Sequence, residues 1–291
     1  MADPVAEQPV LELNWGTIRS AGVADLFDIA AGTGFESVTI TAWKYREALA
    51  AGTSRDELIA RHRASGVAIG YLDGAVRGLP GMADEEGALK SSLEEAFRLA
   101  EDFGIRTFNV THFGGAVDVD RNRLADAVGE MTARAATEGI SIVFEFIPGT
   151  GVPDLASGVR LVQQVGAANL SLLFDTWHHW RSGGRLADLE ALDPSLIGAC
   201  QLADMPADRV DTFRADDPEA AERNARMYRP MTGRLLPGDG VLPLTEVCAW
   251  FATHRPELPW GAEVFSADLD AMAPEDAAAA TYRSLLELAV P

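Results

Sequence analysis

Cysteine is scarce in this chain, which has only Cys200 and Cys248 among its 291 residues. Neither belongs to a Cys-x-x-Cys pair or to a spacing typical of zinc ligands. This scarcity argues against a disulfide-stabilised scaffold and favours a reducing compartment, the cytoplasm. Long apolar runs are also missing, because no stretch approaches the roughly 20 residues of a membrane-spanning helix. The segment from Met1 to Val10 lacks the apolar core of a secretory signal, so we expect none.

Basic residues are few, with 24 lysines and arginines against 44 aspartates and glutamates, and the formal net charge is -20. A field of this sign repels polyanions. We therefore expect neither nucleic acid nor a membrane as a partner, although a few local arginines still allow a small anionic substrate. Assembly into a homo-oligomer is compatible with this composition.

Apolar residues, at 47%, are plentiful enough for one sizeable core, and they recur in a regular order. Helical stretches that close on a glycine are followed by a short β-rich run: FESVTIT after Gly34, VAIGYLD after Gly66, IRTFNVTHF after Gly104 and ISIVFEF after Gly139. Glycine is favoured there because it adopts the left-handed conformation of a helix C-terminus without steric cost. Nearly continuous apolar runs are typical of parallel strands covered by helices.

Eight such runs predict eight strands: Leu11–Gly16, Phe35–Thr41, Val67–Asp73, Thr107–Phe113, Ser141–Ile147, Leu170–Trp177, Ile197–Asp204 and Trp260–Phe265. Helices are expected between them, among them Asp84–Phe103, Arg121–Glu138 and Pro274–Ala289. This repeat predicts a single α/β domain over residues 1–291, folded as a closed (β/α)8 TIM barrel. A doubly wound open sheet is the alternative, weakened by the lack of a Gly-x-Gly-x-x-Gly turn after an early strand.

One polar segment, residues 205–237, interrupts this order after the seventh run. It is charged and strandless, with a helix expected around Asp217–Arg226. The segment is either a solvated surface excursion or a lid, because a loop that follows a barrel strand lies over the active-site face.

Acidic and amide side chains stand inside four of the later apolar runs. Glu145 closes SIVFE, Asp175 closes LSLLFD, Gln201 lies in IGACQLAD and Glu263 lies in WGAEVF. Because side chains alternate faces along a strand, each polar residue shares its face with a small residue, while bulky residues such as Phe144 mostly face the helices. We therefore expect the four polar side chains to converge inside the barrel at its C-terminal mouth.

Three carboxylates that meet in a dry pocket repel one another and lose hydration, so they need a counter-charge. One divalent metal ion supplies it, and oxygen ligands suit Mn2+, Mg2+ or Co2+, with Zn2+ as a further option. The predicted ligands are Glu145, Asp175, Gln201 and Glu263. The alternative, a layer of arginine salt bridges, is disfavoured for four polar residues in successive strands.

Several segments also carry a family resemblance: FEFIP, LLFDTWHHWRSGG, QLAD, RLLPGDGVLPL and GAEVF. From about Leu11 to the C-terminus, the chain resembles the xylose-isomerase-like TIM-barrel superfamily, with its sugar phosphate isomerases and epimerases and its AP endonuclease family 2. That superfamily also includes inosose and 3-dehydroshikimate dehydratases and endonuclease IV.

The resemblance implies the same metal ligands and assigns further roles. Glu145 and Glu263 would exchange protons with the substrate. His178, three residues after the aspartate ligand, would be oriented toward the substrate, and Arg234, just before the Pro-Gly-x-Gly turn, would contact it.

Two positions depart from the epimerase pattern. Gln201 stands where the epimerases usually carry a histidine, and some 3-dehydroshikimate dehydratases have a glutamine at this position. Gly151 stands where the epimerases carry a glutamate. The glutamine shifts weight toward a lyase, and the glycine removes support from a sugar epimerase. The multi-histidine set of endonuclease IV is absent, which together with the net charge argues against DNA repair.

Three further residues are candidates for contact with the substrate. His112, in NVTHF, either faces the substrate or is a hydrogen-bonded barrel histidine. Trp15 and Trp177 follow strand ends, where they either form an apolar wall around the site or pack between helix and barrel.

The expected chemistry starts from a ketone that the metal polarises, so that a carboxylate can take a proton from the neighbouring carbon. Return of the proton to the enediolate gives epimerisation or isomerisation, whereas loss of a β-hydroxyl gives dehydration. We therefore expect a divalent-metal-dependent isomerase or epimerase of a sugar or polyhydroxylated ketone. The alternatives are a dehydratase of the 3-dehydroshikimate or inosose type, and a non-catalytic barrel that binds a small molecule.

Replacement of Gln201 by histidine tests the predicted ligand set. Imidazole is a better donor than an amide oxygen for borderline metals, so Gln201→His should strengthen Zn2+ binding relative to Mn2+ without loss of the fold. Calorimetric titration of both proteins with the two ions measures the effect. An unchanged ratio of Zn2+ to Mn2+ affinity would remove Gln201 from the ligand set.

Overall fold

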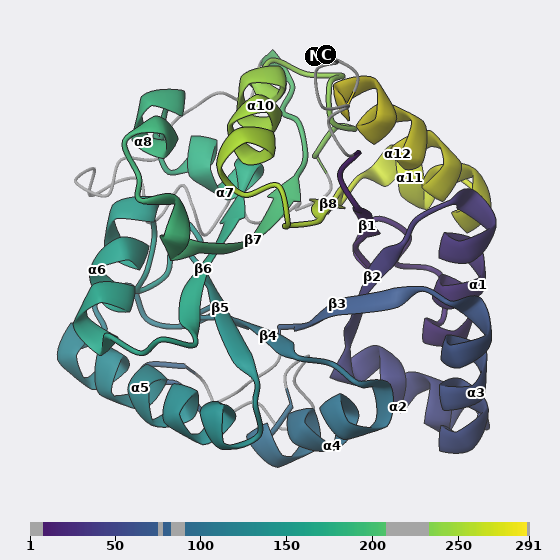
Figure 1. Cartoon of the computed structure of the whole chain (residues 1–291), viewed down its shortest axis with the longest axis horizontal. Helices are drawn as coiled ribbons and strands as arrows, with labels where there is room; N and C mark the ends of the chain where they lie inside the picture. The colour runs from purple at the N-terminus through teal and green to yellow at the C-terminus, as the bar shows by residue number, and fades with distance from the viewer. Residues whose placement is uncertain (1–7, 75–77, 83–90, 208–232, 290–291) are drawn as a thin grey trace, which may run out of the picture.

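The computed structural model describes residues 8–74, 78–82, 91–207 and 233–289. Eight parallel strands close into a barrel in chain order, with the last strand hydrogen-bonded to the first (Figure 1). They are β1 (Leu11–Leu13), β2 (Ser37–Thr41), β3 (Ala68–Asp73), β4 (Thr107–Thr111), β5 (Ser141–Glu145), β6 (Leu170–Asp175), β7 (Ile197–Leu202) and β8 (Trp260–Ala262). The predicted (β/α)8 barrel is confirmed, and the open sheet is excluded.

Helices surround the barrel on its outer side (Figure 1). They are α1 (Val23–Thr33), α2 (Ala42–Ala50), α3 (Arg55–Ser65), α4 (Leu93–Phe103), α5 (Arg121–Thr137), α6 (Leu155–Val165), α7 (Thr176–Arg181), α8 (Leu186–Glu190), α10 (Leu244–His254), α11 (Ala267–Asp270) and α12 (Pro274–Ala289). Gly34, Gly66 and Gly104 end α1, α3 and α4 with φ of 111°, 69° and 72°, the left-handed conformation expected of them. Within the described ranges, no helix is long and apolar enough to cross a membrane.

All eight predicted strands are present, but each of them except β2 and β3 ends earlier than predicted. In β6 the cause is a helix cap. The carboxylate of Asp175 accepts a hydrogen bond from the backbone N–H of His178 at 2.9 Å and so starts α7. Trp177, placed at a strand end by the sequence, therefore lies on a helix.

One predicted helix starts later than expected, and other predicted segments lie outside the described residues. Helix α4 begins at Leu93 behind the Ser92 cap, so the prediction of a helix from Asp84 was wrong at Ser91 and Ser92. Residues 84–90 lie outside the described ranges, as do most of the polar segment 205–237 and its predicted helix.

Apolar side chains form two layers, as the alternation of faces predicted. Residues that face the helices belong to the main core, among them Ile142, Phe144, Leu172 and Phe174. A separate small cluster fills the inside of the barrel: Tyr71, Val143, Leu173 and Ala199. The last three lie two residues before Glu145, Asp175 and Gln201, so those polar groups continue the inner face toward the mouth.

Both cysteines are free and buried. Cys200 lies on β7, where its thiol donates to the carbonyl oxygen of Pro259 at 3.3 Å, and Cys248 lies on α10. Burial raises the pKa of Cys200 to about 12 and that of Cys248 well above its ordinary value. Near neutral pH, neither side chain forms the reactive thiolate.

Glu12 on β1 is an acidic residue buried inside the barrel, with 2% of its surface exposed. Ser37 donates a hydrogen bond to its Oε2 at 2.6 Å. Gly70 makes room for it, since a Cβ there would lie 1.8 Å from the same oxygen. Burial raises the pKa of Glu12, the Ser37 hydrogen bond lowers it and the charge of Asp73 raises it, and the net result is a pKa of about 7. The fold therefore favours the protonated acid.

Replacement of Glu12 by glutamine should stabilise the protein at alkaline pH. The unfolded chain loses this proton near pH 4.5 and the folded chain near 7, so the stability that the group contributes falls as pH rises between these values. Glutamine removes this loss of about 3 kcal/mol. We expect Glu12→Gln to unfold at a higher temperature than the wild type at about pH 8, and at a similar temperature at about pH 4. A difference independent of pH would contradict the prediction.

Candidate active site

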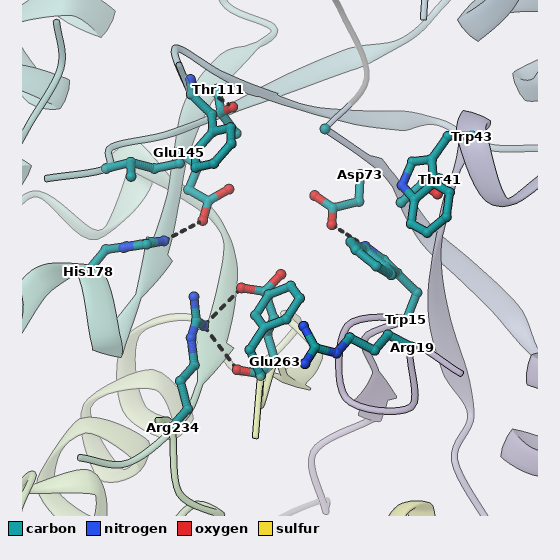
Figure 2. A pocket seen from close by; sticks show the side chains of 14 residues that line it. Trp15, Arg19, Thr41, Trp43, Asp73, Thr111, Glu145, His178, Arg234 and Glu263 are labelled. Atoms are coloured by element: carbon teal, nitrogen blue, oxygen red, sulfur yellow. Dashed lines mark hydrogen bonds and ion pairs between the residues drawn. The ribbon is translucent and has the colours of Figure 1, made fainter. Parts of the chain in front are cut away.

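A cavity of about 390 Å3 opens at the carboxyl ends of the strands, a size that suits a small-molecule ligand. Five of its polar lining residues come from separate parts of the chain: Asp73, Glu145, His178, Arg234 and Glu263. In Figure 2, the carboxyl groups of Glu145 and Asp73 face each other, with Glu263 below and between them and Arg234 below Glu145 and His178. The polar groups thus surround a space in which one substrate can meet all of them.

Aromatic side chains line part of the same cavity: Trp15, Trp43, Phe113 and Phe265. Trp15 packs edge-to-face against Trp43 and Phe265, with ring centroids 5.4 Å and 5.7 Å apart. The structure therefore places Trp15 in the apolar wall for which the sequence made it a candidate.

Glu145, Asp175 and His178 form a compact group. One ligand atom from each lies within 4.8 Å of the others. His178 Nε2 is 3.3 Å from Glu145 Oε1 and 3.8 Å from Asp175 Oδ2. The histidine predicted to face the substrate thus lies beside two of the predicted metal ligands.

Arg234 is the charge that joins Asp175 to Glu263. Its guanidinium is 2% exposed, and Nη1 lies 2.9 Å from both Asp175 Oδ2 and Glu263 Oε2. The same nitrogen donates to the backbone carbonyl of Glu263 at 3.0 Å. Arg234 therefore compensates the two carboxylates within the protein itself.

Asp204 shapes the loop that carries Arg234. It pairs with Leu235 through backbone hydrogen bonds of 2.9 Å, and its carboxylate accepts from the N–H groups of Gly238 and Leu242. A Cβ at Gly240 would lie 2.4 Å from Asp204 Oδ1, so the Pro-Gly-Asp-Gly turn requires glycine there. This turn is folded around one buried carboxylate.

The shared guanidinium affects its two partners unequally. Burial raises the pKa of Asp175, but Arg234, His178 and a backbone N–H outweigh it, so the pKa lies below its ordinary value. Burial also raises the pKa of Glu263, and there the nearby carboxylates oppose Arg234, so the pKa stays well above its ordinary value. Asp175 is therefore held as the anion, whereas Glu263 retains a proton more readily.

Gln201 is oriented by its amide nitrogen, which donates to the Tyr71 hydroxyl at 2.8 Å and to Glu263 Oε1 at 3.1 Å. Its amide oxygen is buried and has no hydrogen-bond partner among the described residues. A buried acceptor without a donor is costly unless a cation or donor meets it. The unpartnered oxygen is the atom with which Gln201 would meet a divalent ion, and Glu145 and Asp175 belong to the compact group that could hold the same ion.

Two predicted substrate contacts, His112 and Trp177, do not line this cavity in the described structure. His112 Nδ1 accepts from the backbone N–H of Gly151 at 3.0 Å, so Nε2 carries the proton and donates to the Pro80 carbonyl at 2.8 Å. Trp177 is buried under the guanidinium of Arg234, 5.7 Å from the ring centroid. In the described structure His112 is therefore a hydrogen-bonded barrel histidine, and Trp177 packs beside Arg234.

Gly151 explains one departure from the epimerase pattern. A Cβ there would lie 2.3 Å from a methyl carbon of Val119 and 2.9 Å from His112 Nδ1. A glutamate cannot enter this position without movement of its neighbours.

Asp73, at the end of β3, is a cavity carboxylate that the sequence analysis missed. Trp15 Nε1 donates to one of its oxygens at 2.5 Å, and Asn109 Nδ2 donates to the other at 2.8 Å. Burial and the neighbouring Glu145 raise the pKa of Asp73, these donors lower it, and the net result is a pKa of about 6. The signal was available, because Asp73 closes VAIGYLD as Asp175 closes LSLLFD.

The closed barrel and its carboxylate-lined mouth define a TIM barrel with a candidate divalent-metal site. Residues 27–288 match the family model of the xylose isomerase-like TIM barrel, and the chain belongs to this family. The resemblance found in the sequence is thereby confirmed.

A curated relative, inosose dehydratase 1 of Bacillus cereus, is 34% identical over 127 residues. These residues are 43% of this chain and 41% of the relative, so less than half of either protein is matched.

Two solved structures share the fold at 16% identity. The IOLI protein with a bound zinc atom superposes with a TM-score of 0.75 over 96% of this chain and 97% of its own. The apo form of 3-keto-D-glucoside 4-epimerase, YcjR, from E. coli superposes with a TM-score of 0.65 over 92% and 94%.

Removal of the Arg234 charge tests its role as an internal counter-charge. Arg234→Gln leaves Asp175 and Glu263 buried without compensation, so the metal-free protein should lose about 3 kcal/mol of stability. Because a divalent ion then supplies the missing charge, Mn2+ should raise the unfolding temperature of this variant more than that of the wild type. Thermal unfolding with and without Mn2+ measures both effects, with Arg234→Lys as the charge-retaining control. Equal shifts in the wild type and Arg234→Gln would contradict the prediction.

Proposed function

We propose that this protein is a divalent-metal-dependent isomerase or epimerase that acts on a sugar or another polyhydroxylated ketone. The observation that carries the proposal is the presence of Glu145, at the end of β5, and Glu263, directly after β8, on one cavity (Figure 2). Each has its own basic neighbour, His178 at 3.3 Å and Arg234 at 2.9 Å. Two such carboxyl groups can take a proton from one side of a substrate and return it from another.

The metal ion of this proposal would be held by the predicted ligands Glu145, Asp175, Gln201 and Glu263. His178 could join them, because one of its ring nitrogens lies within 4.8 Å of ligand oxygens of Glu145 and Asp175. When bound, it would polarise the substrate carbonyl and offset the negative charge that develops on the oxygen. The unpartnered amide oxygen of Gln201 supports this ligand set.

The side chains then have distinct tasks. Glu145 takes the proton from the carbon next to the carbonyl, and Asn109 orients it by donating to its Oε2 at 2.8 Å. Glu263 gives a proton to the enediolate, either on the opposite face, which yields the epimer, or on the neighbouring carbon, which yields the isomer. The aromatic wall around Trp15 excludes water, so the enediolate is not lost to solvent protons.

A dehydratase is the second candidate. Gln201 replaces the histidine usual in the epimerases, and the crowding at Gly151 excludes their additional glutamate. The matched relative is an inosose dehydratase, which supports the same reading. In this reaction Glu145 takes the same proton, and a carboxyl group protonates a β-hydroxyl that leaves as water.

Incubation of the Mn2+-loaded protein in D2O with a panel of ketoses and cyclic ketones tests the proposal. We expect deuterium next to the carbonyl together with an epimer or isomer. Glu145→Gln and Glu263→Gln should lower this exchange by at least about 100-fold, because each loses one proton-transferring group. Glu130→Gln, on the exposed face of α5, is the matched control and should leave exchange unchanged.

The products separate the candidates. Accumulation of a dehydrated product would replace isomerisation by the lyase reaction. If no ketone exchanges or reacts while ligands still bind, the protein is a non-catalytic barrel and the proposal is wrong.

A further inference from the structure

Asp73 differs from the other carboxylates of the cavity in the partners that it meets. Glu145 lies beside His178, and Asp175 and Glu263 lie beside Arg234. Among the residues that the structure describes, the side-chain partners of Asp73 are the neutral donors Trp15 and Asn109. It is 7% exposed and lines the cavity, so its charge is neither paired nor well hydrated.

The hydrogen bonds of Asp73 leave room for one more donor. A carboxylate offers about four acceptor positions. Trp15 Nε1, Asn109 Nδ2 and the backbone N–H of Gly74 occupy three of them. A carboxylate with a remaining acceptor position on a ligand cavity accepts readily from a hydroxyl group and repels another anion.

Asn109 also sets Asp73 relative to Glu145. Its amide nitrogen donates to Asp73 Oδ1 and to Glu145 Oε2, both at 2.8 Å. One side chain on β4 therefore holds an acceptor on β3 and the proposed base on β5 in fixed positions. A substrate hydroxyl held by Asp73 would be oriented relative to the carbon from which Glu145 takes its proton.

The wall beside Asp73 favours a ring. Trp15 uses its indole N–H on Asp73 and packs edge-to-face with Trp43 and Phe265, so it adds apolar surface to the cavity (Figure 2). Such a surface suits the C–H face of a saturated ring. Arg19, a cation that lines the same cavity, is engaged by Asp270, whose hydrogen bond raises the Arg19 pKa.

We propose that Asp73, oriented by Trp15 and Asn109, accepts a hydrogen bond from a ring hydroxyl of the substrate and thereby selects uncharged polyhydroxylated rings over carboxylated rings of similar shape. This inference rests on the proposed function, because it assigns the substrate class of the same cavity. Asp73 is then a specificity-determining residue at the end of β3, which Asn109 holds next to Glu145.

Binding of two unreactive ring polyols to the Mn2+-loaded protein tests the inference. Myo-inositol is uncharged, and quinate carries a carboxylate on a comparable hydroxylated ring. We expect calorimetry to show tighter binding of myo-inositol than of quinate. Asp73→Asn should weaken myo-inositol binding by about tenfold, the loss expected for a hydrogen bond to a charged group, and should narrow its advantage over quinate. Asp126→Asn, on the exposed face of α5, is the matched control and should change neither affinity.

The outcomes are decisive in both directions. Quinate binding as tight as that of myo-inositol in the wild type would overturn the inference, and this comparison needs no variant. Unchanged myo-inositol affinity in Asp73→Asn, with a lowered unfolding temperature, would make Asp73 purely structural and also overturn it. Asp73→Ser repeats the comparison if the asparagine variant does not fold.

The same assay separates this inference from the proposed function. Polyol binding requires no proton transfer. If myo-inositol binding depends on Asp73 but no ketone is turned over, the proposed enzymatic function is wrong and the role of Asp73 in ligand selection stands. If a ketone is turned over but Asp73→Asn binds myo-inositol as the wild type does, the enzymatic function stands and the role of Asp73 is wrong.

Discussion

The buried guanidinium of Arg234 is the contact on which the mouth of the barrel depends. Asp175 and Glu263 come from strands that are not adjacent, and the same nitrogen of Arg234 meets both. Burying two such carboxylates is tolerable only with opposite charge close by. The loop after β7 is accordingly built to deliver that charge, since Asp204 fixes the turn that follows Arg234 and Gly240 allows its close approach.

Much of this architecture could be predicted because it depends on local rules. Apolar runs behind glycines located all eight strands, and the alternation of faces placed Val143 inside the barrel and Phe144 against the helices. Strand ends were predicted less well, because they depend on side chains that cap the next element. Asp175 is the example, since it was predicted as a ligand and also starts α7.

The site itself was predicted only where the residue type already implied its chemistry. An acid at the end of an apolar run was recognised in β6 and overlooked in β3, although the pattern is the same. What sets Asp73 apart is contact with Trp15, in the turn after β1, and with Asn109 on β4. These contacts leave no trace in the local sequence around Asp73. His112 was predicted as a possible substrate contact from its residue type. Both of its ring nitrogens are instead hydrogen-bonded to backbone groups far away in the sequence.

The buried thiols have a practical consequence. Cys200 and Cys248 are enclosed by the core and hold their protons at neutral pH, so maleimide reagents have no accessible thiolate to attack in the described structure. A single cysteine introduced on the outer face of α5 would consequently take up a fluorophore at one position, with both native thiols left in place. Energy transfer to a coloured ligand then becomes accessible without a cysteine-free background.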